Sequence, residues 1–141
     1  MARATKASKK SRKRKLRLAF ISSEPSAALL HLPGFKSQTD AKIVALTTLN
    51  GTRLPSNPAY IGASIFEEDY VRMIETVKPD AVYVITSPLQ RYDIAATVLE
   101  MGCNLFINKP PAITSEQFRQ LGILAKKQVS SAKSVGSLWL G

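Results

Sequence analysis

Short apolar runs alternate along the chain with segments whose apolar residues recur at helical spacing. The runs at 16–21, 42–48, 63–66, 81–86 and 104–108 are short and often β-branched, which predicts five strands. The helical spacing predicts helices at 27–32, 70–77, 92–101 and 114–127. Glycine and proline punctuate the pattern, most densely at 49–62, which is predicted as a loop.

The helix at 70–77 has one apolar face, made by Tyr70, Ile74 and Val77. Three acidic residues at 67–69 are expected in its first turn, where the helix dipole favours negative charge.

The last helix opens with Thr114 and Gln117, which have the spacing of a capping box. Its inward face is expected to consist of Phe118, Leu121 and Ala125.

Strand and helix alternate through most of the body, which predicts an α/β fold with a parallel, doubly wound sheet of Rossmann type. We expect one domain over 16–141, preceded by a disordered basic tail at 1–15. In such sheets ligands bind beyond the carboxyl ends of the strands. The loops at 22–26, 47–53, 86–91 and 108–111 are therefore the candidate site.

The positive charge of the chain is concentrated at its beginning. The net charge is +10, but residues 1–17 carry nine Lys or Arg and no acid, so the other 124 residues are near neutral at +1. The tail can make weak, nonspecific contacts with nucleic acid or serve as a nuclear localisation signal. A solvated extension without a binding role is an equally good interpretation of the tail. It has no aromatic residue for base readout.

The remaining composition excludes several classes of function. Cys103 is the only cysteine and His31 the only histidine, which excludes an internal disulfide, a nucleophile–histidine triad and a histidine-based metal site within one chain. We expect Cys103 to be a buried, inert thiol and His31 to have a packing or solvent-facing role. No apolar run is long enough to span a membrane, and the expected location is the cytoplasm, or the nucleus if the tail acts as an address.

Two stretches of the chain resemble one known family. Residues 78–88, KPDAVYVITSP, are similar to the K-P-D-x-V-x-V-x-T-x-P stretch of the glucose-fructose oxidoreductase / inositol dehydrogenase family (Gfo/Idh/MocA). Residues 95–110 resemble the A-L-E-x-G-K-H-V-x-x-E-K-P stretch of that family, and 31–35 echo its H-x-P-x-L. The resemblance covers about residues 16–128 in order.

This resemblance implies a Rossmann domain that binds NAD or NADP and belongs to an oxidoreductase acting on sugar- or polyol-like alcohols. It places Lys109 near the nicotinamide and the substrate, where it is the candidate catalytic residue. Redox catalysis in the family also needs a second domain, which we expect this chain to lack. The expected partners are the nucleotide cofactor and either a homo-oligomer or that missing domain.

The chain departs from the family pattern at the glycine loop. The three family glycines fall on Ser23, Pro25 and Ala28, and Glu24 adds a negative charge. Proline removes an amide donor, and a carboxylate about 4 Å from a phosphate costs up to about 4 kcal/mol at an effective dielectric near 20. These substitutions put a tight pyrophosphate cradle in question.

Other departures bear on the cofactor and the substrate. The second strand ends without the acid that would bind the ribose hydroxyls of NAD, which slightly favours NADP. Asn108 replaces the glutamate of E-K-P, and Arg91 stands where a histidine is usual. The full set of predicted cofactor-binding residues is Ser22, Ser23, Pro25, Thr48, Arg53, Thr86, Pro88, Arg91, Asn108 and Lys109.

Two main functions remain open from the sequence, besides the weaker hypothesis of nucleic-acid binding by the tail. The first is an NAD(P)-binding oxidoreductase domain that is not catalytically competent alone. The second is a non-catalytic regulatory or interaction module that kept the fold and lost tight cofactor binding. We expect no metal site in either case.

Overall fold

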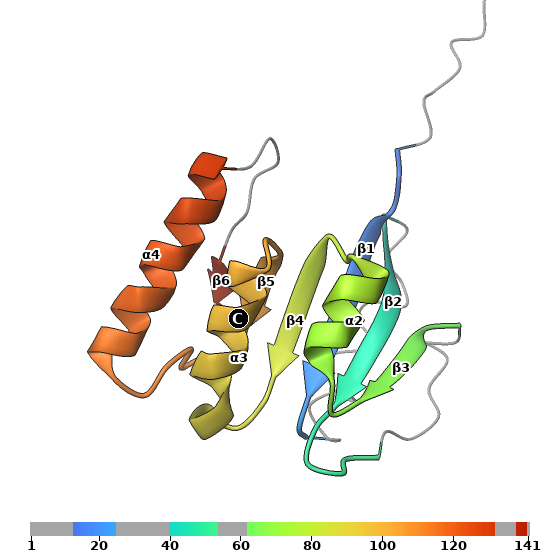
Figure 1. The fold of residues 1–141 in the computed structure, drawn as a ribbon, viewed down its shortest axis with the longest axis horizontal. Helices are drawn as coiled ribbons and strands as arrows, with labels where there is room; N and C mark the ends of the chain where they lie inside the picture. The colour runs from blue at the N-terminus through green and yellow to red at the C-terminus, as the bar shows by residue number, and fades with distance from the viewer. Residues whose placement is uncertain (1–12, 25–39, 54–61, 132–137, 141) are drawn as a thin grey trace, which may run out of the picture.

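The computed structural model describes residues 13–24, 40–53, 62–131 and 138–140. Its central feature is a six-stranded parallel sheet in the order β3-β2-β1-β4-β5-β6 (Figure 1). The strands are β1 (Leu16–Ser22), β2 (Ala41–Thr48), β3 (Ser64–Glu67), β4 (Ala81–Ile85), β5 (Asn104–Ile107) and β6 (Leu138–Leu140). The helices are α2 (Tyr70–Val77), α3 (Pro88–Glu100) and α4 (Ser115–Ser131). The predicted α/β Rossmann-like fold is confirmed.

The central strands are buried on both faces, which explains their continuous apolar sequences. Helices α2, α3 and α4 cover one face (Figure 1), where the core includes Ile21, Val84 and Leu105. Alternate residues of the same strands, among them Phe20 and Tyr83, form a second cluster. The predicted helix at 27–32 lies outside the described residues, as do residues 1–12 of the predicted tail.

The acidic residues before α2 do not lie in its first turn, so that prediction was wrong. Glu67 is the last residue of β3, and Glu68 has a positive φ of 56°. Asp69 is the N-cap, and its side chain accepts a hydrogen bond from the Arg72 amide at 2.9 Å. An aspartate that can cap the helix satisfies one free amide, which stabilises it more than a position inside the turn would.

Helix α3 begins at Pro88, four residues earlier than predicted from its apolar spacing at 92–101. Proline fits at the first position because it has no amide hydrogen to leave unpaired. The first turn therefore lies directly after β4, and it brings Gln90 and Arg91 to the carboxyl end of the sheet.

The capping box of α4 is confirmed. The Gln117 amide donates to Thr114 Oγ1 at 3.2 Å, and the Thr114 amide donates to Gln117 Oε1 at 3.4 Å. Leu121 is fully buried and Ala125 packs against the core, but Phe118 is 49% exposed, contrary to the prediction. The inward stripe runs through Leu121, and at about 100° per residue Phe118 falls at the edge of that stripe.

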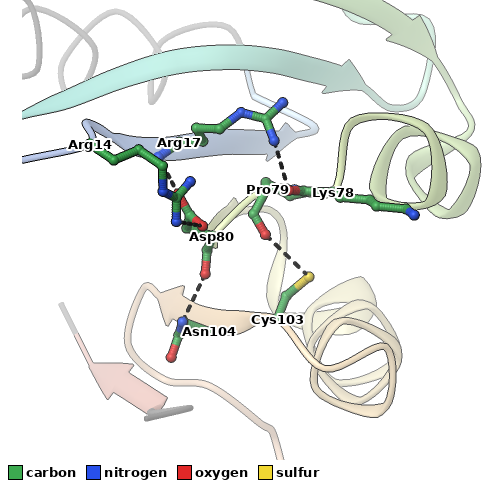
Figure 2. Close-up of polar contacts among 7 residues, drawn as sticks. All are labelled: Arg14, Arg17, Lys78, Pro79, Asp80, Cys103 and Asn104. Carbon is green, nitrogen blue, oxygen red and sulfur yellow. Dashed lines mark hydrogen bonds and ion pairs between the residues drawn. The ribbon is translucent and has the colours of Figure 1, made fainter. Parts of the chain in front are cut away.

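A polar cluster joins β1 to the start of β4 at the amino-terminal rim of the sheet (Figure 2). Arg14, inside the predicted tail, donates to both carboxylate oxygens of Asp80 at 3.0 and 2.8 Å, and the Arg17 amide donates to the same carboxylate at 2.7 Å. Burial raises the pKa of Asp80, but the hydrogen bonds from Arg14 and Arg17 outweigh it and hold that pKa below its ordinary value. This rim lies opposite the predicted site and has a structural role.

Cys103 borders the same cluster. It is buried, and its Sγ lies 4.0 Å from the Pro79 carbonyl oxygen (Figure 2). Burial raises the pKa of the thiol, and the charge of Asp80 adds to the effect. The prediction of a buried, inert cysteine is consistent with both observations.

Candidate functional site

The loops that follow β1, β2, β4 and β5 meet at the carboxyl edge of the sheet, as predicted. Ser22, the last residue of β1, is paired in register with Thr48 of β2 on one side and Ile85 of β4 on the other. Val84 of β4 is paired in turn with Ile107 of β5. Because all pairs are parallel, the side chains that follow these residues lie along one rim.

The hydroxyls of Ser22 and Ser23 both make hydrogen bonds, the first within the loop after β1 and the second with the segment after β4. Ser22, which is buried, donates to the Glu24 carbonyl at 2.9 Å and accepts from the Glu24 amide at 3.2 Å. Ser23 Oγ accepts from the Ser87 amide at 3.2 Å, and the Ser23 carbonyl accepts from Thr52 Oγ1 at 3.0 Å. Ser23 thus connects the loops after β1, β2 and β4.

The amides in this part of the loop are already engaged. The Ser23 amide donates to the Ile85 carbonyl at 3.2 Å, and the Glu24 amide donates to Ser22 Oγ at 3.2 Å. Pro25 has no amide hydrogen and lies outside the described residues. Between 23 and 25 the loop therefore has no backbone donor left for a phosphate.

The loop after β2 holds two of the predicted residues. Thr48 is buried at the end of the strand, and Arg53 is exposed. Between them Asn50 and Gly51 both have positive φ, 58° and 65°, and the Gly51 amide donates to the Glu68 carboxylate at 2.7 Å. This tight turn directs the Asn50 side chain to α3, where it pairs with Gln90.

Thr86 follows β4 and carries an unusual polar group. It is 1% exposed, and within the described ranges its hydroxyl oxygen has no hydrogen-bond partner. Buried hydroxyls are nearly always paired, with protein, water or a ligand. Pro88, two residues on, is exposed at the start of α3.

The Arg91 side chain points into the interior of the protein. It is 6% exposed, and its guanidinium donates to the Pro110 carbonyl at 2.6 Å and to the Thr86 carbonyl. Burial lowers the pKa of Arg91, and the negative charge of Glu24 works against that shift. Arg91 thus clamps the loop after β4 to the loop after β5, and it places a positive charge near Glu24.

Asn108 and Lys109 follow β5. The Tyr83 hydroxyl donates to Asn108 Oδ1 at 2.9 Å, and Lys109 is exposed just before a cis peptide bond to Pro110. Tyr83 packs between the rings of Phe20 and Phe106, and burial raises its pKa, which keeps the phenol protonated as a donor. The Asn108 amide oxygen is therefore engaged, while Lys109 faces solvent.

The structure thus brings nine of the ten predicted residues to one rim, and the tenth, Pro25, lies outside the described part. Sequence reasoning missed Thr52, Tyr83 and Gln90 as residues of the site. The sequence did hold a signal for Gln90: Ser87 and Gln90 have the spacing of a capping box, which indicates a helix start directly after the strand. No local signal pointed to the partners of Thr52 or Tyr83.

Two further classes of site find no support in the described part of the chain. In these residues no three His, Cys, Asp or Glu side chains come together in a group that could bind a metal ion. Over the same ranges, no helix has the length and apolar character needed to cross a membrane.

Comparison with known proteins gives consistent matches. Residues 17–134 match the model of an oxidoreductase family with an NAD-binding Rossmann fold, Gfo/Idh/MocA. The chain is 30% identical over 112 residues to D-glucoside 3-dehydrogenase of Escherichia coli (strain K12), covering 79% of this chain and 32% of that protein.

Solved structures agree on the fold. A Gfo/Idh/MocA family oxidoreductase from Vibrio cholerae superimposes with a TM-score of 0.68 at 25% identity, over 90% of this chain and 38% of that one. A 3-ketoreductase from Actinomadura kijaniata, solved with NADP, gives a TM-score of 0.66 at 18% identity, over 82% and 36%. The chain thus spans about a third of the length of these relatives. It belongs to the Gfo/Idh/MocA oxidoreductase family and corresponds to the NAD-binding Rossmann domain of that family.

Proposed function

We propose that this chain binds a nicotinamide dinucleotide along the carboxyl rim of its sheet, with NADP slightly preferred over NAD. The observation that carries the proposal is the buried Thr86 hydroxyl, which has no partner among the described residues and lies where four loops converge. A buried polar atom of this kind calls for a hydrogen-bond partner, which a bound ligand or an ordered water would supply. The residues present therefore fit the cofactor at the β4 side of the rim.

The proposed arrangement follows the order of the strands. Thr48 and Arg53, after β2, would hold the adenosine ribose, and Thr86 and Pro88 would line the middle of the rim. Asn108 and Lys109, after β5, would face the nicotinamide, which supplies or accepts a hydride when the cofactor is bound. Arg91 would act indirectly, by holding the loops after β4 and β5 together.

The preference for NADP rests on charge. Thr48 ends β2 with a neutral side chain, and Arg53 is exposed five residues later, so β2 and its loop supply a positive charge and no acid of their own, although the Glu68 carboxylate lies 2.7 Å from the Gly51 amide of that loop. The 3-ketoreductase relative was solved with NADP. Because Arg53 is solvent-exposed, its attraction to the phosphate is screened and the preference is small.

Calorimetric titration of the full chain with NADPH and NADH tests this proposal. We expect both to bind, NADPH a few times more tightly, and Arg53→Gln to remove that difference without weakening NADH. Arg119→Gln, an exposed arginine on α4, is the matched control. No heat with either nucleotide at millimolar concentration would overturn the proposal.

The role of Lys109 can be separated with fragments of the cofactor. We propose that Lys109 contacts the nicotinamide end and that turnover requires the further domain of the relatives, which act on sugar-like substrates if D-glucoside 3-dehydrogenase is a guide. Lys109→Met should weaken reduced nicotinamide mononucleotide and leave 2′-phospho-ADP-ribose unchanged. The opposite pattern would place Lys109 at the other end of the rim.

A second function is favoured by the loop after β1. The amides of Ser23 and Glu24 are engaged and Glu24 is charged, which suits a regulatory or interaction module that has lost tight cofactor binding. A dissociation constant in the micromolar range for NADPH or NADH would exclude this alternative. Millimolar binding that tightens in Glu24→Gln would support it, because removal of the carboxylate removes repulsion from the phosphates.

A further inference from the structure

Asn50 and Gln90 form a reciprocal pair across the carboxyl rim. Asn50 Nδ2 donates to Gln90 Oε1 at 3.1 Å, and Gln90 Nε2 donates to Asn50 Oδ1 at 3.1 Å. Asn50 lies in the loop after β2, and Gln90 lies in the first turn of α3, after β4. We call these two side chains the carboxamide strap.

The strap connects elements that are not neighbours in the sheet. β1 lies between β2 and β4, so a link from the β2 loop to α3 passes the end of β1. The same loops are also joined by Thr52 and Ser23 at 3.0 Å, and by Ser87 and Ser23 at 3.2 Å. Three polar connections therefore draw the loops after β1, β2 and β4 together.

The strap is well held at its β2 side. Asn50 has a positive φ, a conformation that asparagine tolerates better than most residues, and the next amide is bound by the Glu68 carboxylate at 2.7 Å. The orientation of Asn50 is therefore set by the turn, and Gln90 completes both hydrogen bonds from α3.

Given the proposed function, we infer that the carboxamide strap closes the adenosine end of the rim and competes with the dinucleotide. In a sheet of this topology the adenosine ribose lies at the end of β2, and the ligand runs past β1 towards β4. Asn50 and Gln90 meet along that course, so the two hydrogen bonds must open before the adenosine can bind. Asn50 and Gln90 thereby set the affinity for the adenosine half and leave the nicotinamide half unaffected.

Two variants of the full chain test this inference. Gln90→Ala removes both hydrogen bonds, and Asn50→Gly does so with a residue that accepts positive φ. Each should bind NADPH about five- to tenfold more tightly, because the exposed bonds no longer have to break. The double variant should gain no more than either single one, since each substitution already removes the whole pair. Gln120→Ala, which removes an exposed carboxamide on α4 that donates to Glu116, is the control.

The ligands and a second measurement separate the outcomes. Reduced nicotinamide mononucleotide should bind every variant as it binds the unsubstituted chain. Hydrogen exchange of amides 49–53 should accelerate in Gln90→Ala and not in Gln120→Ala. If the unsubstituted chain binds NADPH and the strap variants bind it equally or more weakly, the competition is refuted and the proposed function stands. If no variant binds any nicotinamide nucleotide, both the proposed function and the competition by the strap are refuted.

Discussion

The buried guanidinium of Arg91 offers a quantitative test of how the rim is assembled. Arg91→Met keeps most of the apolar stem and removes the donors to the carbonyls of Thr86 and Pro110. Both carbonyls belong to loops that lead into the predicted site. If Arg91 is a clamp, its removal should destabilise the whole domain.

The expected loss follows from the contacts. A hydrogen bond from a charged donor contributes about 1.5–3 kcal/mol, so two of them contribute about 3–6 kcal/mol. Part of this is offset, because a cation leaves the interior and because Arg91 Nε is buried with no partner among the described residues. We expect a net loss of about 3 kcal/mol, a large share of the typical stability of a domain.

Urea unfolding followed by circular dichroism measures the loss. The midpoint should fall while the slope with urea stays constant, which indicates a change in stability without a change in the surface exposed. Arg119→Met is the control, because Arg119 and Glu116 are both exposed and solvent screens their ion pair, so its loss should change stability little. A loss in Arg91→Met no larger than in this control would refute the clamp.

Three further predictions concern other parts of the chain. The folded pKa values of Asp80 and of Glu116, the latter about 2, lie below their ordinary values, so the stabilisation by these carboxylates is full above about pH 5 and is lost as pH falls below that. Asp80→Asn should flatten the acid side of a stability–pH curve, and an unchanged curve would contradict this. Cys103 should react with a thiol reagent at least about tenfold more slowly in the folded chain than in urea, since burial disfavours the thiolate, and equal rates would show that it is accessible. Lys78 has a φ of 48° at the end of α2, so Lys78→Gly should raise the unfolding free energy by about 0.5 kcal/mol. Thr76→Gly, inside the helix, should lower the unfolding free energy. A lower unfolding free energy in both variants would show that no strain is relieved at Lys78.

The architecture could be predicted from the sequence because it depends on local patterns. Apolar runs on the central strands and helical spacing elsewhere define which faces are buried, and each pattern spans only a few residues. Capping at Thr114 was predictable for the same reason. The start of α3 did not follow from apolar spacing, because Leu89 is 81% exposed; its sequence signal was Ser87 followed by Pro88, with Gln90 at capping-box spacing.

The location of the rim also followed from the sequence, because parallel strands bring their carboxyl ends to one edge. The hydrogen-bond partners of the residues on that rim did not follow from the sequence. Asn50 meets Gln90 across 40 residues, and Arg14 meets Asp80 across 66, contacts that depend on strand order and register.

Arg91 shows the difference most clearly. Its position in the sequence placed it on the rim, but whether its charge faced a ligand or the interior depended on free carbonyls supplied by two separate loops. Local sequence determines which residues reach the edge of a sheet. Their partners, and hence the groups left for a ligand, are determined only when distant segments pack, because buried polar groups must pair with whatever the fold brings near.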